Sequence, residues 1–110
     1  MIHITLWQNE KEEIIAFEVD GHAGYGEEGW DIVCSAVSAL TIAALNGLTE
    51  YVLLSAKIEL RDGYVHCSLP KRMDEVQSVQ AQAILRTLDL AFESIEDQYG
   101  RYVKLNRKNL

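Results

Sequence analysis

The spacing of the apolar residues changes along the chain, and this change limits the folds that the sequence can adopt. Near the N-terminus apolar residues occupy every second position, at Ile2, Ile4 and Leu6 and then at Ile15, Phe17 and Val19. Beyond Asp31 they recur every three or four positions, at Val33, Val37, Leu40, Ala44 and Leu48. Alternation is typical of a strand, and the longer spacing of an amphipathic helix. The sequence therefore predicts a β-hairpin that turns at residues 8–11, followed by a helix of roughly 18 residues with Asp31 as its N-cap.

The second half of the chain repeats this order. Asp62-Gly63 is a strong signal for a two-residue hairpin turn, and alternating apolar residues flank it on both sides. Helical spacing returns between Met73 and Ile95, and residues 102–105 supply one more short alternating segment. The order ββαββαβ predicts an α+β two-layer sandwich, with two helices packed on one face of a mainly antiparallel sheet.

Length and charge restrict the class of protein. The 110 residues suit a single domain, residues 1–110. The formal net charge of -7 opposes a phosphate backbone and favours a basic partner, so direct nucleic-acid binding is not expected. Polar residues interrupt the apolar stretches, which fall short of the roughly 20 residues of a membrane span. The N-terminus lacks the basic region and cleavage site of a signal peptide, so we expect a cytoplasmic protein with two thiols, Cys34 and Cys67.

Residues 21–38 differ from the rest because glycines are concentrated between a predicted strand and a predicted helix. The spacing Gly24-x-Gly26-x-x-Gly29 matches the dinucleotide-binding fingerprint. In that fingerprint a pyrophosphate lies at the helix N-terminus, where Glu27 and Glu28 would repel it. We therefore reject a nucleotide site and expect no cofactor.

Cys34 is the best candidate for a nucleophile. With Asp31 as N-cap it occupies the third helical position, where unpaired backbone N–H groups and the helix dipole favour a thiolate and could form an oxyanion hole. Asp31 and Ser38 lie at i-3 and i+4 and share its face. His22 follows the second strand, and the loop after it is long enough to bring the imidazole to Cys34 as a base. From the residues alone, an inert core Cys34 and a hydrogen-bonded loop His22 remain the alternative.

A zinc site is the other chemistry that these residue types suggest. His22, Cys34, His66 and Cys67 are acceptable ligands. His66 and Cys67 are adjacent on a predicted strand and point to opposite faces, and no paired CxxC or HxxxH spacing is present. We therefore expect no metal site, a core position for Cys67, and solvent-facing positions for His3 and His66.

The acidic residues near Cys34 complicate its activation. Glu27, Glu28 and Asp31 oppose a thiolate, so we expect the resting thiol to be protonated. Our hypothesis is that residues 24–30 form a mobile substrate loop whose glutamates meet basic residues of the target. Either packing or substrate contact suits Trp30, because large aromatic residues serve both roles.

Two blocks of this sequence resemble a known family. Gly21-His22-Ala23, followed by Asp31-Ile32-Val33-Cys34-Ser35-Ala36-Val37-Ser38, is similar to the signature of the ribosomal-processing cysteine protease family Prp, and the resemblance covers the length and element order of the chain. It implies that His22 is the general base and acid and that Cys34 is the nucleophile, with Asp31 and Ser38 as supporting positions.

The resemblance also implies a substrate and an assembly. The expected activity is that of a cysteine endopeptidase that removes a short N-terminal extension, ending in aromatic residues before a small residue, from a large-subunit ribosomal protein precursor. A homodimer is expected. Two alternatives stay open: a noncatalytic ribosome-assembly module that binds a basic ribosomal protein, and a small-molecule regulatory domain of the same fold.

Overall fold

The structure, a computed structural model, describes residues 1–21 and 30–110, with side chains after the gap from residue 32 onwards. Its elements are, in chain order, β1 (Ile2–Gln8), β2 (Ile14–Asp20), α1 (Trp30–Asn46), the π-helical turn η1 (Gly47–Tyr51), β3 (Lys57–Arg61), β4 (Tyr64–Ser68), α2 (Glu75–Tyr99) and β5 (Val103–Asn109). The predicted order ββαββαβ is confirmed. The last strand extends beyond the predicted residues 102–105, to Asn109.

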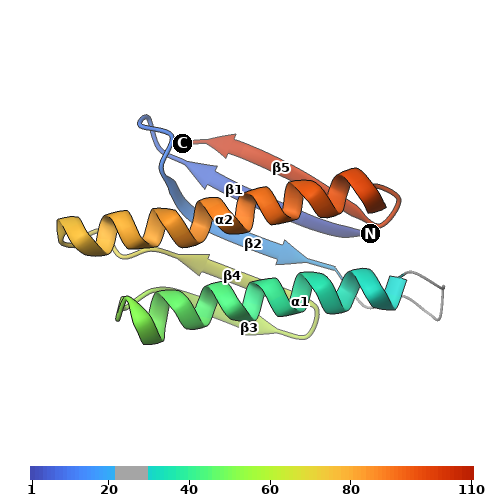
Figure 1. The fold of residues 1–110 in the computed structure, drawn as a ribbon, viewed down its shortest axis with the longest axis horizontal. Coiled ribbons are helices and arrows are strands. Elements are labelled where there is room, and N and C mark those ends of the chain that lie inside the picture. Colours follow the sequence, from blue (N-terminus) through green and yellow to red (C-terminus); the bar gives the residue numbers. More distant parts are fainter. Residues whose placement is uncertain (22–29) are drawn as a thin grey trace.

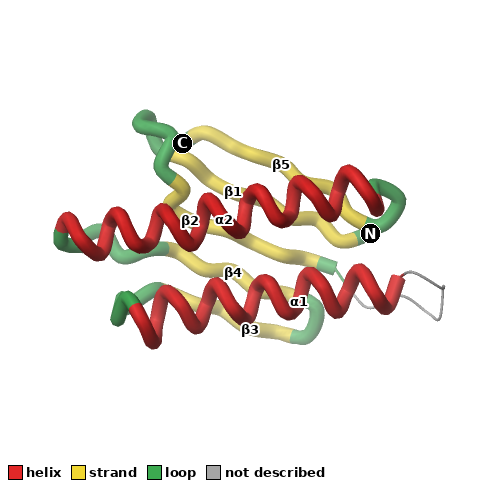
Figure 2. Tube along the Cα trace, viewed as in Figure 1, coloured by secondary structure: helices red, strands yellow, loops and turns green. Residues whose placement is uncertain are grey.

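The five strands form one sheet in the order β3-β4-β2-β1-β5 (Figure 2). The pairs β1–β2, β2–β4 and β3–β4 are antiparallel, and only β1–β5 is parallel. Both helices cover the same face of this sheet (Figure 1). The predicted two-layer α+β sandwich with a mainly antiparallel sheet is therefore confirmed.

The core lies between the sheet and the two helices. Its fully buried large side chains include Ile4 and Leu6 from β1, Phe17 from β2, Val33 from α1, and Leu85 and Phe92 from α2. An irregularity in the β1–β2 register falls between Trp7 and Gln8, where Gln8 pairs with Ile14. This shift buries Ile14 completely and leaves Ile15 only half-buried. The predicted strand is present, but its first inward-facing apolar residue is Ile14 and not Ile15. A bulge changes which side chains face the core.

The first helix begins earlier than expected. α1 starts at Trp30, so Asp31 is its second residue and the predicted N-cap at Asp31 was wrong. The sequence could not distinguish the N-cap from the second helical position for Asp31. An acidic side chain is favourable at both, because both lie near the positive end of the helix dipole.

The helical segment is also longer than expected, because η1 continues it to Tyr51. By length and composition, Ile32–Tyr51, with a mean hydropathy of 1.8, would suffice to cross a membrane. The expectation that no stretch reaches this length was therefore wrong. Its inner face is nevertheless part of the protein core, since Val33, Val37, Ala44 and Leu48 are all buried there. This is the behaviour of an amphipathic helix packed on a sheet.

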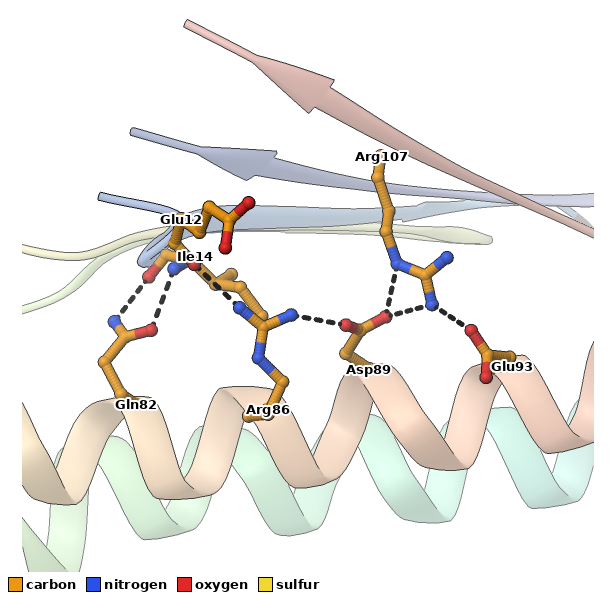
Figure 3. A network of polar contacts seen from close by, with 7 residues as sticks. All are labelled: Glu12, Ile14, Gln82, Arg86, Asp89, Glu93 and Arg107. Carbon is orange, nitrogen blue, oxygen red and sulfur yellow. Dashed lines mark hydrogen bonds and ion pairs between the residues drawn. The ribbon is translucent and has the colours of Figure 1, made fainter. Parts of the chain in front are cut away.

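Polar side chains on one face of α2 hold it against the sheet (Figure 3). The Gln82 amide accepts a hydrogen bond from the Ile14 N–H and donates one to the Ile14 carbonyl, both at 2.8 Å. The buried carboxylate of Asp89 pairs with Arg86 at 2.8 Å and with Arg107 of β5 at 2.7 Å. These contacts tie α2 to β2 and β5, while α1 covers the half of the sheet that contains β4 and β3 (Figure 1).

Candidate active site

A groove of about 790 Å³ lies between α1 and the hairpin formed by β3 and β4. One helical face of α1 lines it with Cys34, Val37, Ser38, Thr41, Ile42, Leu45 and Asn46. The opposite wall consists of residues 60–65, and Ile2, Val19 and Gly21 complete the described lining. The i, i+3, i+4, i+7 spacing of the helical residues explains why one groove can follow the helix for most of its length.

Cys34 lies on the border between this groove and the core. It is half-buried and packs against the core cluster, while its neighbours Val33 and Val37 are buried. The prediction that it flanks the apolar stripe is confirmed. Cys34 is the fifth residue of α1, not the third, so its own N–H is no longer among the four unpaired ones. The Cα–Cβ bonds of a helix tilt toward its N-terminus, however, so the Cβ of Cys34 lies on the side of that first turn.

Of the predicted supporting residues, the structure brings Ser38 to Cys34. Ser38 lies one turn further along α1, is exposed, and lines the same groove. The shared face predicted for Cys34 and Ser38 is therefore confirmed. The Asp31 side chain lies outside the described part of the chain, so its place on this face stays a prediction.

The other predicted site residues also fall outside the described ranges. They are His22, Gly24, Gly26, Glu27, Glu28 and Gly29. For Trp30 the backbone belongs to α1, but the side chain is not described. The pairing of His22 with Cys34 and the substrate loop therefore stay predictions.

Gly21, the residue before His22, lies at the edge of the groove. Its N–H donates to the Gly63 carbonyl in the β3–β4 turn at 2.9 Å, which ties the end of β2 to that turn. Its φ of +154° is one that side-chain-bearing residues rarely adopt, and a Cβ would lie 2.7 Å from the Met1 carbonyl oxygen. Only glycine fits here, and the chain therefore leaves β2 toward residue 22 from a fixed point beside the groove.

Cys67 has the core position that the sequence predicts. It is 1% exposed, and burial raises the pKa of its thiol from 9.0 to about 11. At neutral pH such a thiol is almost entirely protonated, which makes it a poor nucleophile.

His66 lies on the outer face of the sheet, as expected from its position beside the buried Cys67, but neighbouring side chains leave its own side chain only 28% exposed. Its ring lies 5.4 Å from that of Trp7, and its Nδ1 and Nε2 lie 3.3 Å from Glu18 Oε1 and 3.1 Å from Ser68 Oγ. Trp7 and Glu18 come from β1 and β2, which alternation within β4 alone cannot reveal, whereas Ser68 lies two positions further along β4 itself. Within residues 1–21 and 32–110, no three His, Cys, Asp or Glu side chains gather into a metal site.

Among the groove residues that the sequence analysis did not single out, two are large, apolar and exposed. Ile42 on α1 and Leu60 on β3 are large apolar side chains that remain 57% and 65% exposed. Ile42 stands eight positions after Cys34, a spacing that places both on one helical face. That spacing is a signal that the sequence contains, whereas the approach of Leu60 depends on the tertiary fold.

The chain matches a sequence profile of one protein family. The profile, described as cysteine protease Prp, matches residues 1–104. The chain is similar to the ribosomal processing cysteine protease Prp of Staphylococcus aureus, with 30% identity over 108 residues that cover 98% of this chain and 100% of the relative.

Two solved structures are also similar to this chain. One is a crystal structure of the essential ribosomal processing protease Prp from S. aureus with a covalently linked product peptide, at a TM-score of 0.84 and 29% identity. The other shows that protease with a substrate peptide, at a TM-score of 0.85 and 28% identity. In both, the match covers 98% of this chain and 100% of the solved chain.

Proposed function

Since the chain belongs to the cysteine protease Prp family, we propose that Cys34 is its catalytic nucleophile and His22 its general base and acid. A cysteine protease needs a thiol beside a space that a peptide can enter. Of the two thiols, Cys34 lines the large groove, whereas Cys67 is 1% exposed and its pKa is raised to about 11. This difference between the two cysteines is the observation that carries the assignment.

The chemistry would proceed in two steps. His22 takes the proton of the Cys34 thiol, the sulfur attacks the carbonyl carbon of the scissile bond, and the proton passes to the leaving amine as the C–N bond breaks. A water molecule then attacks the resulting thioester, with His22 again accepting its proton, and releases the carboxylate product and the thiol. The Cβ of Cys34 tilts toward the first turn of α1, and backbone N–H groups at a helix start are suitable donors for the oxyanion.

The substrate that we propose is a large-subunit ribosomal protein precursor that carries a short N-terminal extension. Support comes from the similar proteins, which are ribosomal processing proteases and have been solved with peptides. The net charge of -7 suits a basic ribosomal protein, which long-range attraction would bring to the enzyme. Such a substrate is made in the cytoplasm, where we place this protein as well; cell fractionation tests that location.

We further propose that a second copy of the chain covers the outer groove between α1 and α2. This groove measures about 390 Å³ and is lined by Leu40, Ala43, Ala44, Ala83, Ile84, Thr87, Leu88 and Ala91. The lining carries no charged group, and in a two-fold dimer the same surface meets itself. Sedimentation should give the mass of two chains, and Ala83→Glu should shift it to one, while Ser94→Glu on the same helix should not. A single-chain mass for the unmodified protein would contradict this dimer.

The cleavage itself is tested with the full-length precursor and mass spectrometry of the products. The unmodified protein and Cys67→Ala should release the N-terminal peptide, whereas Cys34→Ala should not. His22→Ala should lose most of the rate, because the thiol would lack its base. Cleavage that survives in Cys34→Ala would exclude this thiol as nucleophile. Binding of the precursor by the unmodified protein without cleavage would favour the noncatalytic assembly role instead.

A further inference from the structure

We propose that Ile42 and Leu60 form a specificity subsite away from the scissile bond, which holds a large apolar side chain of the substrate three to four residues from that bond. The inference rests on the proposed function, because it takes Cys34 as the point of attack. It adds which residues select the substrate and how far from the cleaved bond they act.

The exposure of these two side chains is the first observation. Ile42 is 57% exposed on α1 and Leu60 is 65% exposed on β3, and they line the same groove from its two walls. Each leaves apolar surface in water, and an apolar side chain that entered between them would remove that surface from solvent. Leu45 and Val65 line the groove as well, so the apolar character is shared by neighbouring positions.

The second observation is the distance from the nucleophile. Ile42 follows Cys34 by eight positions in α1. A rise of 1.5 Å per residue places them about 12 Å apart along the helix axis. An extended peptide advances about 3.3 to 3.6 Å per residue, so the substrate side chain beside Ile42 belongs to a residue three or four positions from the attacked carbonyl.

Two polar residues that line this part of the groove have partners within the protein. The Thr41 hydroxyl is buried and donates to the Val37 carbonyl at 2.7 Å. The Arg61 guanidinium pairs with Glu59 at 3.6 Å and lies over the Tyr64 ring, 4.1 Å from its centroid. Asn46 and Asp62 also line the groove, so the apolar contact that we propose at Ile42 and Leu60 acts beside polar positions.

The occupant of this subsite is the substrate chain itself. The groove that contains Ile42 and Leu60 also contains Cys34, so a peptide placed for attack continues along it. From Cys34 to Asn46 the helical wall spans about 18 Å, which accommodates roughly five extended residues on one side of the scissile bond.

The test uses quenched fluorogenic peptides that contain the cleavage site of the precursor, with either Leu or Ala at the third or fourth residue on each side of the bond. The unmodified enzyme should prefer Leu by roughly tenfold in kcat/KM at one of these positions. In Ile42→Ala and in Leu60→Ala that ratio should fall toward one.

Matched controls are available on the surface. Val79 is 67% exposed and Leu90 is 56% exposed, both on α2, and neither is among the residues that line the groove. Val79→Ala and Leu90→Ala should keep the Leu preference. The subsite is wrong if the unmodified enzyme shows no preference at these positions, or if Ile42→Ala and Leu60→Ala retain it. Cys34→Ala, assayed in parallel, separates this outcome from a failure of the proposed nucleophile, which would appear as cleavage by that variant.

Discussion

The buried thiol of Cys67 should make the free energy of unfolding decrease as the pH rises through the alkaline range. Burial raises its pKa from 9.0 to about 11 in the folded state. Between these values the unfolded chain loses the thiol proton while the folded protein keeps it, so rising pH favours unfolding. The contribution is fully present below about pH 9 and is lost as the pH rises through the folded pKa. Two pKa units correspond to about 2.7 kcal/mol of the free energy of unfolding.

Urea unfolding of the unmodified protein and of Cys67→Ala, measured from pH 8 to pH 11, isolates this effect. Cys67→Ala is less stable at pH 8 because it leaves a small cavity beside the core. The difference in the free energy of unfolding between the two proteins should shrink by about 2.3 kcal/mol by pH 11, where the folded-state thiol is half ionised, since other groups titrate alike in both. A difference that stays constant across this range would refute the assignment of a raised pKa to Cys67.

Two further substitutions, one of them with a control, test the ion pairs between α2 and β5 and the end of β2. Asp89→Asn removes the buried charge that pairs with Arg86 and Arg107, and it should lower the free energy of unfolding in urea by about 2–3 kcal/mol. Glu93→Gln, which removes only an exposed partner of Arg107, should change it by less than about 1 kcal/mol, and equal losses would contradict this ranking. Gly21→Ala places a Cβ 2.7 Å from a backbone oxygen, so it should lower both Tm and kcat/KM, the latter by roughly tenfold or more; unchanged kinetics would show that the exit from β2 does not position the site.

Apolar spacing was sufficient to predict the elements and the fold class, because each helix and strand buries one face. It could not predict the strand order, because β5, near the C-terminus, pairs in parallel with β1, near the N-terminus, and local spacing does not report on such distant partners. Local alternation also missed the bulge that buries Ile14, since a bulge is a property of two paired strands.

The candidate site was predictable only in part. Helical spacing placed Cys34 and Ser38 on one face beside the core, and this required only the position of α1. The resemblance of the two sequence blocks indicated the family, which the match over residues 1–104 confirms. Leu60 comes from β3, and Trp7 and Glu18 reach His66 from β1 and β2, so the sequence around Cys34 carries no information about these contacts.

The central claim, that Cys34 forms the acyl intermediate, is tested most directly by intact-protein mass spectrometry of an acid-quenched reaction with the precursor. A mass increase equal to the released peptide minus one water, mapped by digestion to Cys34 and absent from Cys34→Ala, is the expected result. An adduct on Cys67 or on another residue, or cleavage by Cys34→Ala at the unmodified rate, would contradict it.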